Sequence, residues 1–234
     1  MIDSRFCEVE QDGNISKEDR GTKICSSKIK IKAELKLADM INLGVEWLKE
    51  ITSPEKIKTS IKDNSSGNYA QIGSPGNYAQ IGSSGDDAKI GSSGNYAQIG
   101  SSGDGAKIGS SGNYAQIGSP GNYAQIGSSG NYAQIGSSGN YAQIGSSGNY
   151  AQIGSSGNDA KIDSTGEGCV IMCAGINSVA KASKGSWITL SEWSYSDKKQ
   201  RYIPVCVKTE FVDGEKIKAD TYYKLAGGVF KEIQ

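Results

Sequence analysis

The chain has 234 residues, of which 32 are glycine, and its hydrophobic content of 36% is low for a conventional globular core. Its 25 basic and 25 acidic residues balance, which argues against a nucleic-acid partner. Histidine is absent, and none of the five cysteines forms a CxxC pair, so we expect no metal site, cofactor or disulfide framework. No signal peptide and no apolar run of roughly 20 residues is present, which predicts a cytoplasmic protein without a membrane partner.

The N-terminal region, residues 1–65, is predicted to cap the array that follows. Residues 28–37 alternate polar and apolar side chains, which is typical of a half-buried strand. Apolar residues at three- and four-residue spacings then predict an amphipathic helix over residues 39–51, with Asp39 as its N-cap. The alternative is a small independent α+β unit.

A nine-residue phrase, GNYAQIGSS with small changes, begins at Gly67 and returns at every ninth position through Gly157, giving eleven copies. Each copy has alanine and isoleucine two residues apart, which places them on one face of a strand. Tyrosine and glutamine, at the interleaved positions, are then expected to face outward. Gly-Ser-Ser-Gly or Gly-Ser-Pro-Gly supplies the corner. One copy cannot bury its apolar pair alone, so the copies must coil and stack.

The deviant copies decide how many repeats form one coil. Wherever tyrosine is replaced, glutamine becomes lysine in the same copy: Asp87 with Lys89, Gly105 with Lys107, and Asp159 with Lys161. These copies are 18 and 54 residues apart, both multiples of 18, whereas 18 is not a multiple of 27. We therefore expect two nine-residue half-coils per coil, 18 residues in all, rather than a triangular coil of 27.

This register gives the two sides different surfaces. One side should expose an unbroken tyrosine ladder with glutamines beside it, at the positions Tyr78, Tyr96, Tyr114, Tyr132, Tyr150, Gln80, Gln98, Gln116, Gln134 and Gln152. The other reads Tyr69, Asp87, Gly105, Tyr123, Tyr141 and Asp159. Asparagines near the start of most copies should form an amide ladder from coil to coil.

Residues 184–234 read as a small antiparallel β module. Asp213-Gly214 and Gly227-Gly228 are predicted hairpin turns, and Ile217–Ala219 a short strand. Five aromatic residues could line a binding site, but are predicted instead to form the core of the module: Trp187, Trp193, Tyr222, Tyr223 and Phe230. The predicted fold is thus dominated by β structure: a flattened β-solenoid over residues 66–183, between a strand–helix cap and this module.

Three resemblances bear on this fold. The nine-residue period is similar to that of calcium-binding β-rolls, but their repeated aspartate loops are replaced here by Gly-Ser-Ser-Gly, so we expect no calcium. The array also resembles bacterial ice-nucleation solenoids, in which tyrosine ladders are thought to join two rods. Ice-binding faces use threonine rows, and no threonine occurs between Gly67 and Ser164. The tail, from Val179 through Leu225, resembles the end of uncharacterised repeat proteins of phages, prophages and gut bacteria, which implies a viral or mobile-element setting.

Catalysis is not expected, because no histidine exists and the solenoid faces are nearly uncharged. The leading hypothesis is a non-enzymatic structural or multivalent interaction protein that uses the tyrosine and glutamine ladder to form a homodimer or to bind a partner. The simpler interpretation is that these side chains only stabilise coil against coil.

The alternative is a phage protein that sequesters a small signalling molecule such as a nucleotide. Its site would be a notch where the tyrosine column is missing, made of Lys89, Gly105, Lys107, Asp86, Asp87 and Asp104. Glycan binding and ice binding are further, weaker alternatives. Each of these functions is compatible with the cytoplasm of a bacterial host or with association with a virion.

Overall fold

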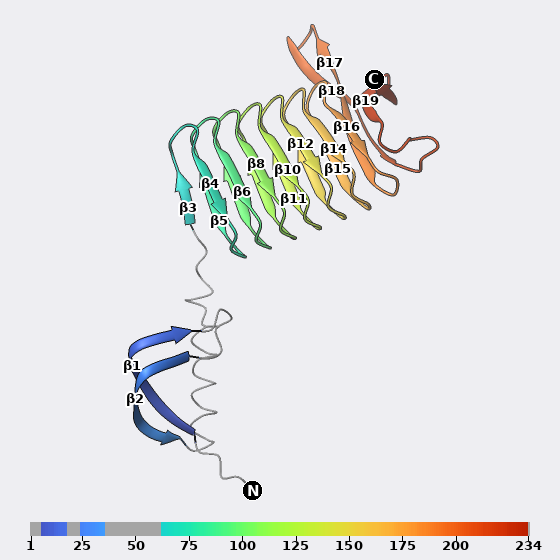
Figure 1. Ribbon diagram of the computed structural model, residues 1–234. Helices are drawn as coiled ribbons and strands as arrows, with labels where there is room; N and C mark the ends of the chain where they lie inside the picture. Colours follow the sequence, from blue (N-terminus) through green and yellow to red (C-terminus); the bar gives the residue numbers. More distant parts are fainter. Residues whose placement is uncertain (1–5, 18–23, 36–61, 234) are drawn as a thin grey trace. The chain divides into compact units, whose positions relative to one another are not determined.

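The computed structural model describes residues 6–17, 24–35 and 62–233 (Figure 1). The chain divides into two compact units, Met1–Lys58 and Thr59–Gln234, and each is described here by itself. The described residues form β-strands and contain no helix.

In the first unit, β1 (Phe6–Lys17) pairs antiparallel with β2 (Ile24–Leu35), with register irregularities at Glu8/Val9 and Asp12/Ile15. Residues 28–35 of the expected strand lie in β2. Ile29 and Ile31 are exposed. The expected helix at 39–51 lies outside the described residues.

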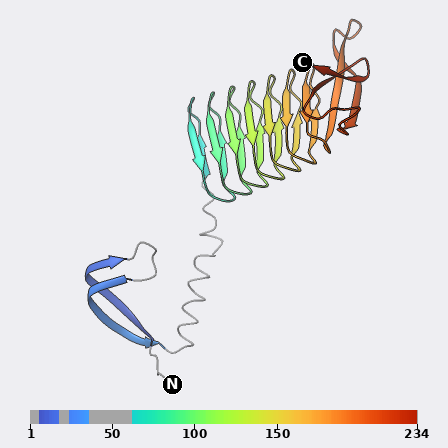
Figure 2. The same ribbon diagram turned by 45° about the vertical axis from the view of Figure 1, so that its right-hand side comes forward.

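The second unit is a flattened β-solenoid of about seven coils of ~18 residues (Figures 1 and 2). Two parallel strands per coil build two facing sheets, so the prediction of two repeats per coil is confirmed. The odd sheet contains β3 (Lys62–Ser65), β5 (Gln80–Ser83), β7 (Gln98–Ser101), β9 (Gln116–Ser119), β11 (Gln134–Ser137), β13 (Gln152–Ser155) and β15 (Val170–Cys173). The even sheet contains β4 (Gln71–Ser74), β6 (Lys89–Ser92), β8 (Lys107–Ser110), β10 (Gln125–Ser128), β12 (Gln143–Ser146), β14 (Lys161–Ser164) and β16 (Val179–Ala182).

The interior between the sheets is narrow and made of small side chains. From Ala79 onward the alanines of the array are 0–1% exposed and the isoleucines at most 4%. The last residue of each strand from β4 to β14, a serine, also points inward and is buried, for example Ser119. Stacking therefore removes from water the apolar pair that a single copy could not bury.

The strand and corner positions differ from those expected. The strand is Gln-Ile-Gly-Ser, and the corner is Ser/Pro-Gly-Asn-Tyr, so the tyrosine lies in the corner and not in the strand. Its backbone is left-handed, with φ of 58° at Tyr114. The expectation that tyrosine faces outward is confirmed, but the corner and not strand alternation is the cause, and it places tyrosine at the edge of its sheet.

Two devices join consecutive corners. The corner glycine has no room for a side chain: a Cβ at Gly112 would lie 1.9 Å from the carbonyl oxygen of Gly94, one coil earlier. The asparagine Oδ1 accepts a hydrogen bond from the backbone N–H of its counterpart 18 residues later, as in Asn95 to Asn113 at 2.8 Å. The expected ladder thus exists, but its usual donor is a backbone N–H and not a side-chain amide.

The C-terminal strands extend both sheets. β17 (Trp187–Ser196) continues the odd sheet in parallel with β15 and then pairs antiparallel with β18 (Arg201–Phe211). β19 (Tyr222–Ala226) and β20 (Val229–Ile233) form a hairpin at the end of the even sheet, and its turn is the predicted Gly227-Gly228. Residues 212–221 form turns without a strand, so the expected strand Ile217–Ala219 and hairpin at Asp213-Gly214 were wrong. Asp213 Oδ1 instead accepts backbone hydrogen bonds from Glu215 and Ile217, which closes a local turn.

Candidate functional site

The tyrosine ladder lies along the edge of the odd sheet and consists of Tyr78, Tyr96, Tyr114, Tyr132 and Tyr150. Adjacent rings stack with centroids 4.9–5.1 Å apart. Three of the four interplanar angles are 4–7° and the last is 15°. These small angles indicate that the coils are nearly untwisted, and the rings remain 44–55% exposed. The structure thus aligns all five predicted tyrosines in one column.

The backbone at this position does not favour tyrosine. A left-handed conformation costs a residue with a Cβ about 1–2 kcal/mol, and glycine, asparagine and aspartate tolerate it best. The residues that replace tyrosine at this position belong to these types: Asp87, Gly105, Asp159, Gly168 and Asn177. A tyrosine at this position therefore carries a backbone cost that a smaller residue would avoid.

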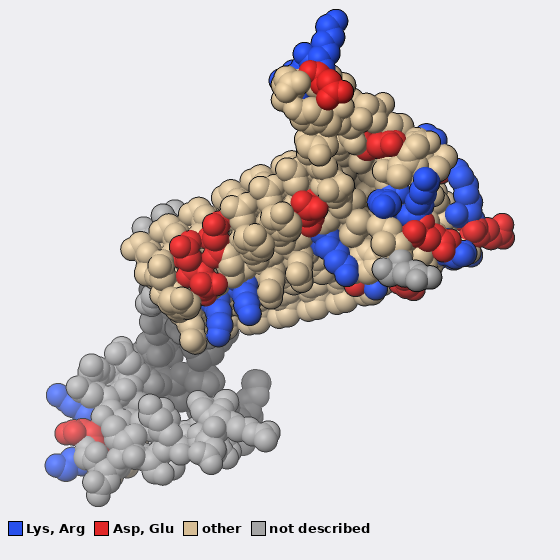
Figure 3. Space-filling view, turned by 90° about the horizontal axis from the view of Figure 1, so that it is seen from above, with Lys and Arg blue, Asp and Glu red and all other residues tan. Residues whose placement is uncertain are grey.

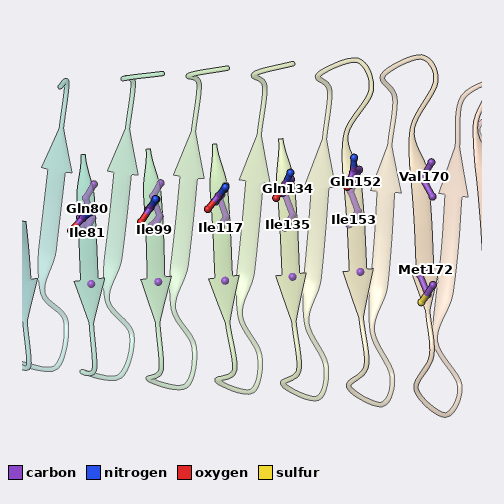
Figure 4. Close-up of a pocket in the computed structure, with 17 residues that line it drawn as sticks. Gln80, Ile81, Ile99, Ile117, Gln134, Ile135, Gln152, Ile153, Val170 and Met172 are labelled. Carbon is purple, nitrogen blue, oxygen red and sulfur yellow. The ribbon is translucent and has the colours of Figure 1, made fainter. Parts of the chain in front are cut away.

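Two further columns lie beside the ladder on the outward surface of the odd sheet, which we call the odd face. The glutamine column is Gln80, Gln98, Gln116, Gln134 and Gln152, and the glycine column is Gly82, Gly100, Gly118, Gly136 and Gly154. A groove of about 910 Å³ runs along them (Figure 4). Neither column contains a charged residue, so the predicted glutamines line one uncharged groove.

The C-terminal end of the odd face is apolar. Val170 continues the glutamine column and Met172 the glycine column, as Figure 4 shows, and both are about half exposed. In β17, the next strand of this sheet, Trp187 is paired with Val170 and is 47% exposed. The centres of the Trp187 and Phe211 rings lie 5.0 Å apart. The expectation that Trp187 belongs to the core of the module is wrong, because it occupies an outward position of the odd sheet.

The opposite surface, the even face, contains the predicted notch residues in a different arrangement. Lys89 and Lys107 are in register on adjacent strands and line a groove of about 510 Å³. Asp86 and Asp104 lie in the corner, where each Oδ1 accepts a backbone N–H of the next coil. Among the described residues, the two lysines form no salt bridge with these aspartates.

The predicted gap at Gly105 is not open. A Cβ built there would lie 2.4 Å from Oδ1 of Asp87, so this carboxylate occupies the space beside the Gly105 backbone. The notch is therefore reduced to the two lysines and their groove.

A polar cluster ends the even face near β14. The ammonium group of Lys161 lies 4.3 Å from the centre of the Tyr222 ring, and Asp163 accepts a hydrogen bond from the Tyr222 hydroxyl and pairs with Lys181 at 3.0 Å. Burial, reinforced by the Asp163 charge, raises the pKa of Tyr222 to about 12. Its hydroxyl therefore stays protonated and donates to Asp163 at neutral pH.

Cys173, at the end of β15, is a buried free thiol. Burial raises the pKa of the Cys173 thiol to about 12, which disfavours the reactive thiolate. No group of three or more potential metal-ligating side chains occurs in the described part of the chain. The described residues contain no helix that is long and apolar enough to cross a membrane. In the view of Figure 3 the charged side chains lie in small groups on a largely uncharged rod.

Sequence reasoning missed the glycine column and the apolar end of the odd face. The signal for the first was the glycine between isoleucine and serine, which keeps the strand period although glycine is more typical of a corner. The signal for the second was the nine-residue spacing of the inward isoleucine, which continues from Ile153 through Ile162 to Ile171 and so places Val170 and Met172 at outward positions.

Comparison with known proteins gives one partial match. Residues 1–43, within the first unit, match a family model described as a domain of unknown function, DUF7666. No curated protein and no solved structure matches the chain. The comparison thus concerns the N-terminal region alone, and the solenoid is interpreted from its own geometry.

Proposed function

We propose that this protein is a non-enzymatic interaction protein whose solenoid associates with a second copy of itself through the odd face. The observation that carries the proposal is the unbroken column of five stacked, half-exposed tyrosine rings beside an uncharged sheet surface. Exposed aromatic surface of this extent is typical of protein interfaces. Because the column repeats with the coil, many weak contacts add along one rod.

Retention of tyrosine in a left-handed corner supports a role for the ring. Stacking between coils accounts for part of that role, and it operates equally within one rod. Self-association would add a use for the exposed part of each ring. We place the protein in the cytoplasm of a bacterial host as part of a virus or mobile element, and the resemblance of its tail to phage repeat proteins supports this setting.

The test is the double substitution Tyr114→Asn with Tyr132→Asn. Asparagine is chosen because Asn177 already adopts the left-handed conformation at the equivalent corner, so the backbone should tolerate it. Sedimentation equilibrium should show a dimer for the wild type and a shift toward monomer for the variant. The matched control is Tyr123→Asn with Tyr141→Asn at the other edge, which should remain dimeric. A wild-type chain that is monomeric at tens of micromolar would contradict the proposal.

A second candidate function is sequestration of a small anion such as a nucleotide at Lys89 and Lys107. The observation that favours it is that two ammonium groups lie in register over one groove without a salt bridge. Titration calorimetry with cyclic nucleotides should then give saturable heat that is lost in Lys89→Gln with Lys107→Gln. Absence of heat with the wild-type chain would reject this candidate. Unlike the first proposal, it predicts no dependence on the tyrosine ladder.

A further inference from the structure

The glycines of the array fall into two classes that differ in what the fold requires of them. A Cβ at each corner glycine from Gly85 onward would come within 2.1 Å of a backbone oxygen. A Cβ at the strand glycines, such as Gly118 and Gly136, would meet nothing within 4 Å. None of these strand glycines has the positive φ that would favour glycine either.

The strand glycines are therefore not explained by the fold. Glycine weakens the interior of a strand, where β-branched residues fit best, and it often marks a place that a ligand or another backbone approaches closely. Yet this position is glycine in all ten strands from β4 to β13, while the tyrosine and glutamine positions vary. An external surface that lies against the sheet would account for glycine there.

The odd face has one bulky half and one hollow half. Outward side chains follow in a fixed order: tyrosine from the corner, then glutamine and glycine, which alternate with inward residues along the strand, then serine or proline where the next corner begins. The fourth column is Ser84, Ser102, Pro120, Ser138 and Ser156. A second hollow of about 650 Å³ lies over the glycine and serine/proline columns, next to the first groove. The large side chains thus stand on one side of a line along the rod and the recess lies on the other.

From this asymmetry we infer that two copies pack odd face to odd face as parallel rods, with the glutamine column of each seated in the glycine column of the other. A twofold axis parallel to the rods, between these two columns, places glutamine opposite glycine and the tyrosine ladder opposite the serine/proline column. Both copies repeat at the same coil spacing, so every coil meets its counterpart. This inference rests on the proposed self-association and specifies its geometry.

The alternative orientation does not use the recess. A twofold axis across the rods would make them antiparallel and would set each column against itself, glutamine on glutamine and glycine on glycine. The parallel arrangement also brings the apolar ends of the two faces together, so that Val170 and Trp187 lie against Met172 and Thr189 of the other copy. These half-exposed apolar side chains are then covered.

The size and charge of the odd face suit such a pair. From β5 to β17 it is about 34 Å long, and from tyrosine to serine about 20 Å wide, by strand spacing and rise. Two such faces bury roughly 1,400 Å² in total, which is within the range of specific interfaces. The same packing on the even face would bury Lys89 and Lys107 against glycines without partners, which is unfavourable.

The test fills the glycine column. Gly118→Val with Gly136→Val adds side chains where a Cβ meets nothing, so the monomer should fold with unchanged circular dichroism and an equal or higher melting temperature. We expect dimer affinity to fall at least tenfold in sedimentation experiments. The matched control, Gly127→Val with Gly145→Val, fills the even face in the same way and should leave dimerisation unchanged. Dimerisation of the odd-face variant at wild-type affinity would overturn the inference.

Orientation is tested by disulfide trapping. A mixture of differently tagged chains, one with Gln134→Cys and one with Gly136→Cys, should form a disulfide-linked heterodimer under mild oxidation. Pairing Gln134→Cys with Gly100→Cys, two coils away, should not. Crosslinking of Gly136→Cys chains to themselves, without the heterodimer, would overturn the parallel arrangement. If the tyrosine variant loses the dimer while the valine variant keeps it, this inference fails and the proposed function stands. If the wild type is monomeric, both fail.

Discussion

The odd and even faces are built from copies of the same nine residues, yet from β4 to β13 charged substitutions occur on the even one alone. From β5 to β13 the tyrosine, glutamine and glycine columns of the odd face contain no substitution, and in the fourth column proline replaces one serine, at Pro120. The even face contains Lys89, Lys107 and Lys161, with their partner changes in the corners. Alanine, isoleucine and the corner glycine are the same in both. The fold thus requires the same interior residues and corner glycines in both sheets, whereas the outward columns are free to differ between the two faces.

The largest loss of stability should come from substitutions of the corner glycines, and it should be equal in the odd and even sheets. Gly112→Ala and Gly121→Ala each place a Cβ within 2.0 Å of a carbonyl oxygen, so the coils must separate. We expect each to lose about 3 kcal/mol or more of unfolding free energy in chemical denaturation. Gly118→Ala, in a strand, is the matched control and should be neutral or stabilising. A tolerated corner substitution would show that the coils are less tightly joined than the structure indicates.

Replacing the buried serines should change the unfolding free energy by a smaller amount and in the opposite direction. This change should again be equal in the odd and even sheets. Ser119 Oγ and Ser128 Oγ are buried and make no hydrogen bond in the described structure. Replacing either with alanine removes an unsatisfied hydroxyl and should raise the unfolding free energy by about 1 kcal/mol. Ser129→Ala, at an exposed position, should change nothing measurable. A loss of stability at Ser119 or Ser128 would mean that these hydroxyls are satisfied in solution.

Substitutions of two lysines on the even face should change the stability in opposite directions. Lys89→Gln removes a like charge in register with Lys107 and should stabilise by about 0.2–1 kcal/mol, most at low salt. Lys161→Gln removes the contact with the Tyr222 ring and should destabilise by about 0.5–1 kcal/mol. Thermal melts at two salt concentrations distinguish the two. Equal effects would indicate that local charge on this face does not influence stability.

The smallest change in stability is expected from a pair of hydrogen bonds, here called the clamp, that joins the two sheets at their C-terminal ends. The Glu192 carboxylate, from β17 of the odd sheet, accepts the backbone N–H groups of Gly227 and Gly228 in the β19–β20 turn at 2.7 and 2.8 Å. These two bonds hold the pKa of Glu192 below its usual value. Because the folded-state pKa is lowered, the stabilisation is present above the unfolded pKa of about 4.3 and is lost as the pH falls through the folded-state value.

Glu192→Gln should therefore lose stability at neutral pH and flatten the pH dependence of the melting temperature between about pH 6 and 3. The control is Glu215→Gln, whose exposed side chain makes no hydrogen bond or ion pair in the described structure. An unchanged pH profile in the Glu192 variant would show that the clamp does not stabilise the module.

Much of the fold could be predicted because the spacing of residues in the repeat indicates both the buried face of each strand and the length of a coil. The two-residue spacing of Ala115 and Ile117 indicated one buried face, and the spacing of the three deviant copies indicated an 18-residue coil. The position of tyrosine could not be predicted, because a corner and a strand both expose this side chain. Backbone hydrogen bonds between coils, such as that from the Tyr114 N–H to the Asn131 carbonyl at 2.9 Å, decide that it lies in the corner.

The candidate site divides in the same way. Periodicity alone determined which tyrosines and glutamines share a column, because identical residues at a fixed spacing must align when the chain coils. Only the tertiary structure decided that the strand glycines have open space above them while the corner glycines have none, that Trp187 lies on the outside, and that the Asp87 carboxylate occupies the space beside Gly105. The physical reason is that these properties depend on the distance to the neighbouring coil or strand, and that distance is set by packing, which a linear pattern does not contain.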